Sequence, residues 1–317
     1  MKQRDVALKN KILEFRIGSF LYGTNTPTSD EDYSGVFMPD ENMVFGFDRT
    51  EQVDLSSVSK LENGKNDADA VDKVLYEFRK FVKLSLENNP NVLEMLFINS
   101  DNLLFANRYG HELLENAHLF PHKGLKERFL GYAFSQKHKM VIRTDSFHSL
   151  SNAQEFLNDF IKTDYERKML LAELLPKKLP FFTEKGNHIQ LGDLSLMKSF
   201  QLRKVKKIVD ERLEKATNRT GLMDKYGYDV KFGSHLVRLM LEGIELLKTG
   251  RLTFPLKDRE LLTDIKLGKY KMFEILQMSE ELEKEVESLA EKSSLPSRPR
   301  YAEVQELTKK MLREFLL

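Results

Sequence analysis

The sequence contains no cysteine among its 317 residues. This absence excludes disulfide bonds, catalysis by a thiolate and zinc sites built on cysteine. The sequence also lacks a charged leader followed by an apolar stretch, and it has no apolar run long enough to cross a membrane. From these absences we expect a soluble protein of the cytoplasm that does not engage a membrane.

The sequence has almost no excess of one charge sign. Its 50 lysines and arginines face 49 aspartates and glutamates, giving a formal net charge of +1. Any nucleic-acid site must therefore be a local basic patch. Apolar residues at helical spacing indicate that the densest basic stretch is an amphipathic helix with a solvated face, with a substrate-facing role as the alternative. This stretch is Lys198–Arg219, with Arg203, Lys204, Lys206, Lys207, Arg212, Lys215 and Arg219.

Two kinds of pattern divide the chain. The first third alternates short apolar strands with turn clusters and has a periodic helix around Leu75–Leu86, whereas long helical periods dominate beyond Arg108. The length suits two domains, which we place at 1–107 and 108–317. The predicted later elements are a hairpin at 185–187 and helices over 108–117, 125–144, 151–175, 194–215, 235–249, 261–292 and 301–316.

The pair Gly18-Ser19 follows Ile12–Ile17, which is apolar enough to form a short buried strand. Glycine lets the backbone turn sharply from that strand into a helical segment. Backbone N–H groups at such a turn, together with the Ser19 hydroxyl, can hold an anionic phosphate. This pair therefore predicts a phosphate site.

Two carboxylates follow the turn cluster at 25–29. Asp30–Phe37 reads as the next strand, on which Asp30 and Asp32 share a face because side chains alternate. Carboxylates placed together repel each other unless a cation lies between them, and their hard oxygen atoms suit magnesium or manganese. Alone, Gly-Ser is most often a turn and Asp-x-Asp a solvated strand edge, but in this order and spacing they predict a phosphate site beside a metal site.

At these residues the sequence resembles the DNA polymerase β-like nucleotidyltransferase superfamily. The longer string, Tyr22-Gly23-Thr24 before Ser29-Asp30-Glu31-Asp32-Tyr33, is similar to the branch called the RNA repair pathway DNA polymerase β family. Later blocks at 89–97, 131–140 and 228–239 are also similar to that branch. The Gly-Ser to Asp-x-Asp element is the specific part of the resemblance, because the helical blocks identify the branch without declaring chemistry.

The resemblance implies a third carboxylate just before the helix that leads to Asn89-Pro90-Asn91. That residue is Asp72, which would ligate the metal and accept the proton of the incoming hydroxyl. Asp67, Asp69 and Asp54 are its rivals, and a plain alternative for Asp72 is the N-cap of the following helix. The loop 54–69 is a candidate lid, although a simple connection is the better interpretation.

A cationic set lies later in the sequence. If 228–241 is one helix, Lys231, His235 and Arg238 share a face and can meet the triphosphate or the acceptor. The alternative is a surface stripe balanced by Asp229 and Glu242. The histidines show no metal spacing, since Pro121 separates His118 from His122. Tyr22 and Tyr33 flank the motif, where packing against the sheet is favoured over stacking on a base.

Together these features predict an α+β protein, with an N-terminal polymerase β-like domain built on a mixed sheet and an α-helical domain covering the cleft. The predicted activity is metal-dependent transfer of a nucleoside monophosphate from a nucleoside triphosphate to an acceptor hydroxyl, favouring an RNA 3′ end such as that of tRNA. One alternative is nucleotidylation of a protein or small molecule, and another is a non-catalytic nucleotide- or RNA-binding module. The predicted nucleotide-binding residues are Gly18, Ser19, Lys231, His235 and Arg238, and those for Mg²⁺ or Mn²⁺ are Asp30, Asp32 and Asp72.

Overall fold

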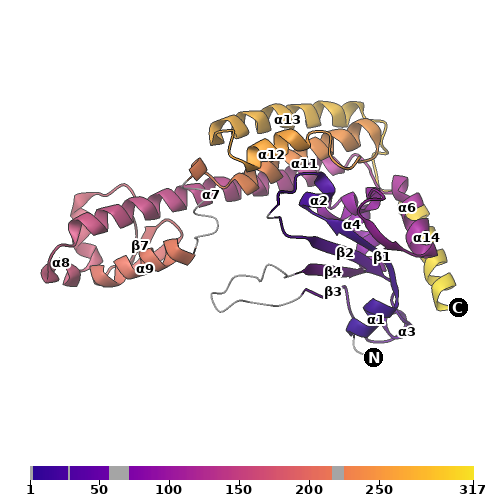
Figure 1. The fold of residues 1–317 in the computed structure, drawn as a ribbon, viewed down its shortest axis with the longest axis horizontal. Coiled ribbons are helices and arrows are strands. Elements are labelled where there is room, and N and C mark those ends of the chain that lie inside the picture. Colours follow the sequence, from indigo (N-terminus) through magenta and orange to yellow (C-terminus); the bar gives the residue numbers. More distant parts are fainter. Residues whose placement is uncertain (1–2, 28, 57–70, 216–224) are drawn as a thin grey trace. The chain divides into compact units, whose positions relative to one another are not determined.

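A computed structural model describes residues 3–27, 29–56, 71–215 and 225–317. The N-terminal region combines short strands and helices around one sheet (Figure 1). Its elements are α1 (Gln3–Lys9), β1 (Lys11–Ile17), α2 (Ser19–Tyr22), β2 (Asp32–Phe37), α3 (Glu41–Val44), β3 (Gln52–Asp54), β4 (Asp72–Glu77), α4 (Phe78–Leu86), α5 (Pro90–Leu93), the 3₁₀ helix η1 (Glu94–Phe97) and β5 (Leu103–Ala106).

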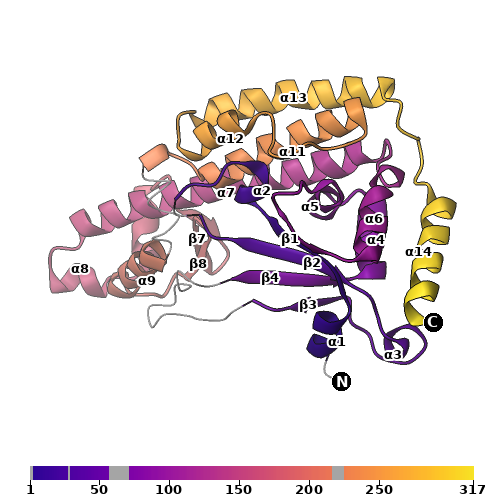
Figure 2. The same ribbon diagram turned by 45° about the vertical axis from the view of Figure 1, so that its right-hand side comes forward.

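The sheet has five strands in the order β3-β4-β2-β1-β5. β2 and β4 run parallel, whereas the other neighbours are antiparallel, so the predicted mixed sheet is confirmed. Because parallel strands begin at the same edge, the first residues of β2 and β4 lie together. Figure 2 shows four of these strands in the order β3, β4, β2 and β1.

Buried apolar side chains fix the register of these strands. Phe37 of β2 and Leu75 of β4 are fully buried, and they pack with Val6 of α1, Met43 of α3 and Val53 of β3. A slip of one residue would turn these side chains to the opposite face of the sheet. The core therefore also determines which residues stand at the polar edge of the sheet.

The remainder of the described chain is mainly helical, as predicted. Its helices are α6 (Arg108–Glu115), η2 (Ala117–Leu119), α7 (Leu125–Phe160), α8 (Asp164–Lys168), η3 (Leu171–Lys177), α9 (Leu202–Lys215), α11 (Val230–Thr249), α12 (Arg259–Lys266), α13 (Met272–Lys292) and α14 (Tyr301–Leu316). A small sheet of β6 (Thr183–Lys185), β7 (His188–Leu191) and β8 (Leu194–Met197) interrupts them, with the predicted turn between β6 and β7. None of the described helices is long and apolar enough to cross a membrane.

Several predicted boundaries were wrong, including the helix expected over 151–175, which the structure divides among α7, α8 and η3. The helix expected from Leu75 begins at Phe78, because 72–77 pairs in the sheet. The break expected at 145–150 is absent, because burial of Phe147 and Leu150 favours one continuous α7 over local propensity. The segment 194–197 pairs with β7 instead of starting a helix. The helix expected over 261–292 is divided near Gly268, whose φ of 71° ends α12.

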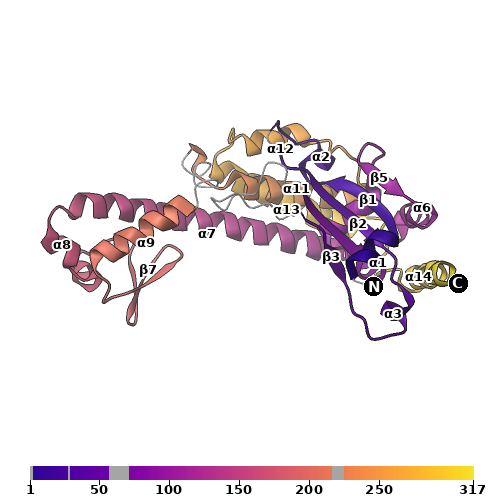
Figure 3. The same cartoon turned by 60° about the horizontal axis from the view of Figure 1, so that its bottom comes forward.

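The chain forms two compact units. Unit 1 comprises 1–133, 236–264 and 278–317, and unit 2 comprises 134–235 and 265–277. Unit 2 has its own core, in which Leu157 of α7, Ile189 of β7 and Val205 of α9 are fully buried, and Figure 3 shows α9 beside α7. The predicted boundary at residues 107 and 108, between a catalytic and a helical domain, concerns function and stays a prediction.

Candidate active site

Gly18 forms the turn that joins β1 to α2. Its φ of 69° and ψ of −142° lie in a region that only glycine adopts readily, and Ser19 then begins the helix. A Cβ atom at this position would lie 2.8 Å from the Oδ2 atom of Asp32. The absent side chain therefore makes room for the Asp32 carboxylate, which brings the two predicted motifs into direct proximity.

Asp32 and Asp72 are the first residues of β2 and β4. They are direct register partners in the parallel pair, and Asp32 is also paired with Ile17 at the end of β1. Paired residues on neighbouring strands project to the same face of a sheet. The edge that carries the Gly18 turn therefore also carries two of the three predicted metal ligands.

Asp30 lies outside the strand in which it was expected. β2 begins at Asp32, and Asp30 is an exposed residue of the preceding irregular segment. Strand alternation therefore does not determine the direction of its side chain, which corrects the expectation of a shared strand face. Between the two aspartates, Glu31 accepts a hydrogen bond from Tyr33 and lies 3.6 Å from the Arg16 guanidinium.

The structure bears on two alternatives to Asp72 as the third carboxylate: that Asp72 is only a helix N-cap, and that Asp54 takes its place. The N-cap of α4 is Glu77, whose Oε1 accepts the N–H of Arg79 at 3.1 Å, so Asp72 is not the cap. Asp54 ends β3 opposite Val74, and its Oδ1 accepts the N–H of Ser56 at 2.8 Å. Hydrogen bonds from Ser56 lower the pKa of the Asp54 carboxyl. The remaining rivals, Asp67 and Asp69, and most of the candidate lid 54–69 lie outside the described residues.

The carboxylate oxygens at this edge of the sheet are the type of ligand that hard divalent cations such as Mg²⁺ prefer. Asp32 and Asp72 offer carboxylate oxygens from adjacent strands, and the Gly18 turn leaves space beside one of them. Within the described part of the chain, however, no three histidine, aspartate or glutamate side chains are gathered closely enough to hold a metal ion. The metal assignment of Asp30, Asp32 and Asp72 therefore stays a prediction.

The predicted cationic stripe is divided between two environments along α11. Lys231 and His235 are exposed residues of unit 2, whereas Arg238 belongs to unit 1 and is only 4% exposed. The helix begins at Val230 instead of Tyr228, and Asp229 accepts the N–H of Lys231 at 3.1 Å. The assignment of these three residues to nucleotide binding stays a prediction.

Arg238 is the centre of a buried ionic cluster. One guanidinium nitrogen donates to Glu94 at 2.9 Å and to Glu242 at 2.8 Å, and the guanidinium lies 4.3 Å from the ring centre of Tyr22. Burial raises the pKa of Glu242 to about 8 and also raises the pKa of Glu94. This guanidinium is thus occupied within the protein. Helical spacing indicated its partner Glu242, four residues later, but gave no signal for its burial or for its contacts to Glu94 and Tyr22.

The two tyrosines beside the motif have different surroundings. Tyr22 is buried, with its ring centre 6.3 Å from that of Phe254, which rules out stacking on a base in this structure. Its hydroxyl donates to Glu94 at 2.8 Å. Tyr33 is half-buried, and its hydrogen bond to Glu31 raises its pKa. Packing was the favoured interpretation of both residues, and it holds for Tyr22.

The basic stretch in unit 2 is largely the predicted amphipathic helix α9. Val205 and Val209 are fully buried, whereas Arg203, Lys204 and Lys207 are exposed. Several of its cations pair with acids, as in Lys206 with Asp210 at 2.6 Å and Arg212 with Asp193 at 2.5 Å. Arg219 lies outside the described residues.

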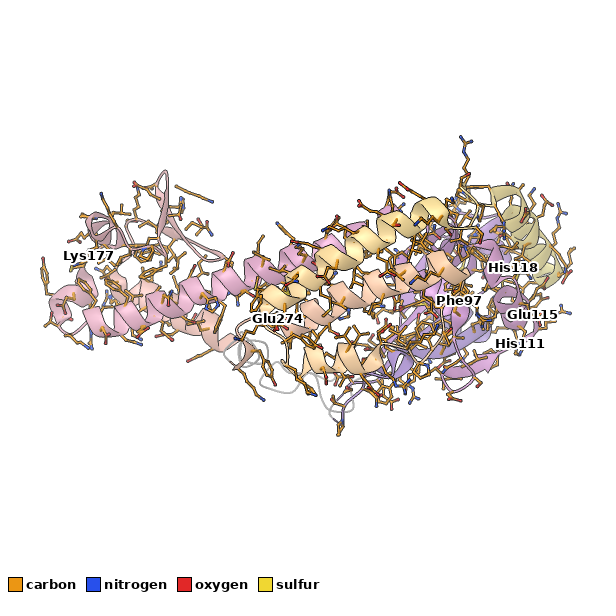
Figure 4. The ribbon with its side chains drawn as sticks, turned by 90° about the horizontal axis from the view of Figure 1, so that it is seen from above. Phe97, His111, Glu115, His118, Lys177 and Glu274 are labelled. Atoms are coloured by element: carbon orange, nitrogen blue, oxygen red, sulfur yellow. The ribbon has the colours of Figure 1, made fainter. Side chains whose placement is uncertain are left out.

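The histidines give no metal centre within the described ranges. His111, Glu115 and His118 are exposed along α6 and η2 (Figure 4). His122 is buried, where its Nδ1 accepts the N–H of Gly124 at 3.1 Å and its Nε2 therefore donates to the carbonyl of Leu86 at 3.0 Å. Burial lowers the pKa of this histidine, which is accordingly a neutral structural residue.

Similar proteins were found by both structure and sequence. One solved structure, a nucleotidyltransferase-like protein from Exiguobacterium sibiricum, matches 99% of this chain and 78% of its own at 8% identity. Its TM-score of 0.26 is too low to support a conclusion about fold or function. A protein of Enterobacteria phage T4, described as an uncharacterized 38.9 kDa protein of the nrdC-mobD intergenic region, is 26% identical over 313 residues, covering 89% of this chain and 90% of its own.

The family comparison covers the polar sheet edge. Residues 3–179 match the RNA repair pathway DNA polymerase beta family, and this range contains the Gly18 turn, Asp32 and Asp72. More than half of the sequence is thus accounted for by one family. Through this match, the chain belongs to the RNA repair pathway DNA polymerase beta family.

Proposed function

We propose that the protein is a metal-dependent nucleotidyltransferase whose acceptor is an RNA 3′ end, such as that of tRNA. Membership of a polymerase β-like family supports nucleotidyl transfer in general. The observation that carries the proposal furthest is the position of the Asp32 carboxylate, which lies between the Gly18 turn and the register partner Asp72.

In the proposed reaction, the acceptor oxygen forms a bond to the α-phosphorus of a nucleoside triphosphate. The bond from that phosphorus to the bridging oxygen breaks, and pyrophosphate leaves. The Ser19 hydroxyl and backbone N–H groups of the first turn of α2 bind the triphosphate, because the first N–H groups of a helix have no partner within it. Asp72 accepts the proton of the attacking hydroxyl.

Asp30, Asp32 and Asp72 are the residues that would hold Mg²⁺ or Mn²⁺. When bound, the metal supplies charge neutralisation at the phosphate oxygens. The exposed position of Asp30 in a segment without regular structure leaves its backbone free of ladder constraints. Lys231 and His235 are retained as candidate contacts to the triphosphate or acceptor.

The experiment identifies the acceptor directly. The protein is incubated with each nucleoside triphosphate labelled at the α-phosphate, with Mg²⁺ or Mn²⁺, and with total RNA or cell lysate. Label that disappears with ribonuclease supports the RNA acceptor, whereas label that disappears with protease supports nucleotidylation of a protein. Label in small molecules supports that alternative, and triphosphate binding without any transfer supports a non-catalytic module. Asp32→Asn is the matched negative control.

A further inference from the structure

The helix that carries Ser19 is too short to hold itself in place. α2 has four residues, Ser19–Tyr22, and isolated helices of this length are unstable in water. The position of the Gly18–Ser19 turn must therefore be set by tertiary contacts. These contacts converge on Tyr22, the last residue of the helix.

Tyr22 is held through its hydroxyl, its ring and its carbonyl. The hydroxyl donates to the two oxygens of Glu94 at 2.8 and 3.1 Å. The guanidinium of Arg238 lies 4.3 Å from the ring centre, and the carbonyl accepts the N–H of Leu256 at 3.2 Å. The contacts come from η1, α11 and the segment before α12, all within unit 1.

The next residue reinforces this attachment. Gly23 ends α2 with a φ of 72°, and a Cβ atom at this position would lie 2.8 Å from the Cβ of Pro255. The backbone therefore approaches the 254–256 segment as closely as a glycine allows. The end of the helix has little freedom to shift.

The charges around Tyr22 form one connected network. Arg238 bonds to both Glu94 and Glu242, and all three side chains are almost fully buried. Removing one member of such a network leaves the others uncompensated in a low-dielectric interior, so their geometry is strongly constrained. Through Glu94, that constraint reaches the Tyr22 hydroxyl.

We propose that Tyr22, Glu94 and Arg238 are positioning residues that hold the Gly18–Ser19 turn in the conformation that receives a triphosphate. The inference rests on the proposed function, because it takes this turn as the triphosphate site. It gives Arg238 an indirect role in nucleotide binding, exerted through Tyr22.

The test compares two tyrosine-to-phenylalanine substitutions, each of which removes one buried hydroxyl and keeps the ring. Tyr22→Phe removes the hydroxyl that bonds to Glu94 but keeps the ring. Tyr109→Phe is the control, because Tyr109 is also buried in unit 1, donates to the carbonyl of Glu314 at 2.7 Å and has a guanidinium, that of Arg108, 4.5 Å from its ring. Glu94→Gln and Arg238→Lys test the partners of Tyr22 with conservative changes.

Hydrogen exchange reports on the turn without any need for activity. The reporter amides are those of Tyr22, Gly23 and Thr24, which donate to the carbonyls of Gly18, Phe20 and Ser19. We expect Tyr22→Phe and Glu94→Gln to increase exchange at these amides about tenfold or more, equal to about 1.4 kcal/mol of local stability. Tyr109→Phe leaves them unchanged at a comparable loss of melting temperature. Unchanged exchange in Tyr22→Phe and Glu94→Gln overturns the inference.

Titration of the same variants with each nucleoside triphosphate and Mg²⁺ gives the second readout. We expect the affinity of Tyr22→Phe and Glu94→Gln to fall about five- to tenfold, with Arg238→Lys intermediate and Tyr109→Phe within about twofold of the natural protein. Equal losses in Tyr22→Phe and Tyr109→Phe would contradict the positioning role. If the natural protein binds no triphosphate, the proposed function fails, and the exchange data alone then decide whether the network fixes the turn.

Discussion

Asp32 and Asp72 are side-by-side register partners at the start of the only parallel strand pair among the described strands. Two carboxylates on adjacent strands repel each other unless a proton or cation lies near them. We expect Asp32→Asn and Asp72→Asn each to reduce transfer by at least about a hundredfold while the protein stays folded. Asp54→Asn, on the neighbouring β3, is the control and should retain activity. Rates from labelled triphosphate, with circular dichroism to check folding, measure both effects.

The same carboxylates predict dependence on a divalent cation. Triphosphate turnover should stop in excess chelator and return when Mg²⁺ or Mn²⁺ is restored, because hard oxygen ligands favour these ions. Calorimetric titration of the metal alone into the natural protein and into Asp32→Asn gives a readout separate from turnover. Undiminished turnover in excess chelator would refute metal dependence.

Gly18→Ala should be more damaging than an ordinary glycine substitution. It combines the cost of a positive φ, about 1 kcal/mol, with a contact 2.8 Å from the Asp32 carboxylate. Gly186→Ala is a matched control, since Gly186 has a φ of 57° but nothing within 4 Å of its would-be Cβ. Gly18→Ala should lose more stability than Gly186→Ala by denaturant titration, and only Gly18→Ala should lose triphosphate affinity. Equal triphosphate affinities of the two variants would show that Gly18 is not part of the triphosphate site.

Ser19→Ala should weaken triphosphate binding without unfolding the protein. It removes one hydroxyl from the turn and keeps the backbone donors of α2. The expected loss is about 1 to 2 kcal/mol, the scale of a hydrogen bond to a charged group. Titration of the folded variant checks this value, and an unchanged affinity would reject the phosphate assignment of Ser19.

RNA binding should depend strongly on salt and on exposed cations of unit 2. Reversing Arg203, Lys204 and Lys207 to glutamate should weaken RNA binding at low salt and spare nucleotide binding, because local cations must neutralise RNA phosphates when the chain has a net charge of +1. Lys231→Glu tests the second candidate position. The matched control replaces three exposed cations of α14 by glutamate and so changes the net charge by the same amount. These cations are Lys309, Lys310 and Arg313. RNA affinity that is negligible, or indifferent to the first set, would favour the protein or small-molecule acceptor.

Stability should vary with pH through Glu242. Burial raises the pKa of this carboxyl to about 8, above its value in an unfolded chain, so the folded state binds the proton more tightly. The resulting stabilisation is fully present below the unfolded pKa of about 4.3 and is lost as the pH rises through about 8. We therefore expect the free energy of unfolding to fall between these limits, and Glu242→Gln to flatten that slope. A slope unaltered by the substitution would assign the titration to another group.

Local sequence patterns predicted the mixed sheet and the helical remainder because strands and helices have distinct periodicities. They also indicated the Gly18 turn, since glycine before a short helix has a direct conformational meaning. They did not give the start of β2. The alternating pattern begins at Asp30, but hydrogen-bonded pairing with the neighbouring strands begins only at Asp32. Strand ends depend on partners, which no local pattern specifies.

The role of Arg238 shows the limit of helical spacing. The spacing places Lys231, His235 and Arg238 three and four residues apart, but it does not say which elements cover each position. Glu94 lies 144 residues before Arg238 in the sequence, and Tyr22 lies still farther away, so their contacts with Arg238 depend on the tertiary fold. The pairing of Asp32 with Asp72 is equally non-local, and only the family resemblance pointed to Asp72, whose role as a metal ligand stays a prediction.

The discontinuity of unit 1 also has a consequence for biosynthesis. A ribosome releases the chain in order, so the Gly18–Ser19 turn emerges long before Arg238 and Leu256, which hold its helix through Tyr22. Residues 134–235 are made in between and have a core of their own, so they can fold while the earlier segment still waits for its partners. We therefore expect the Gly18–Ser19 turn to reach its final conformation late in synthesis, and a prematurely terminated chain would carry the motif without the geometry.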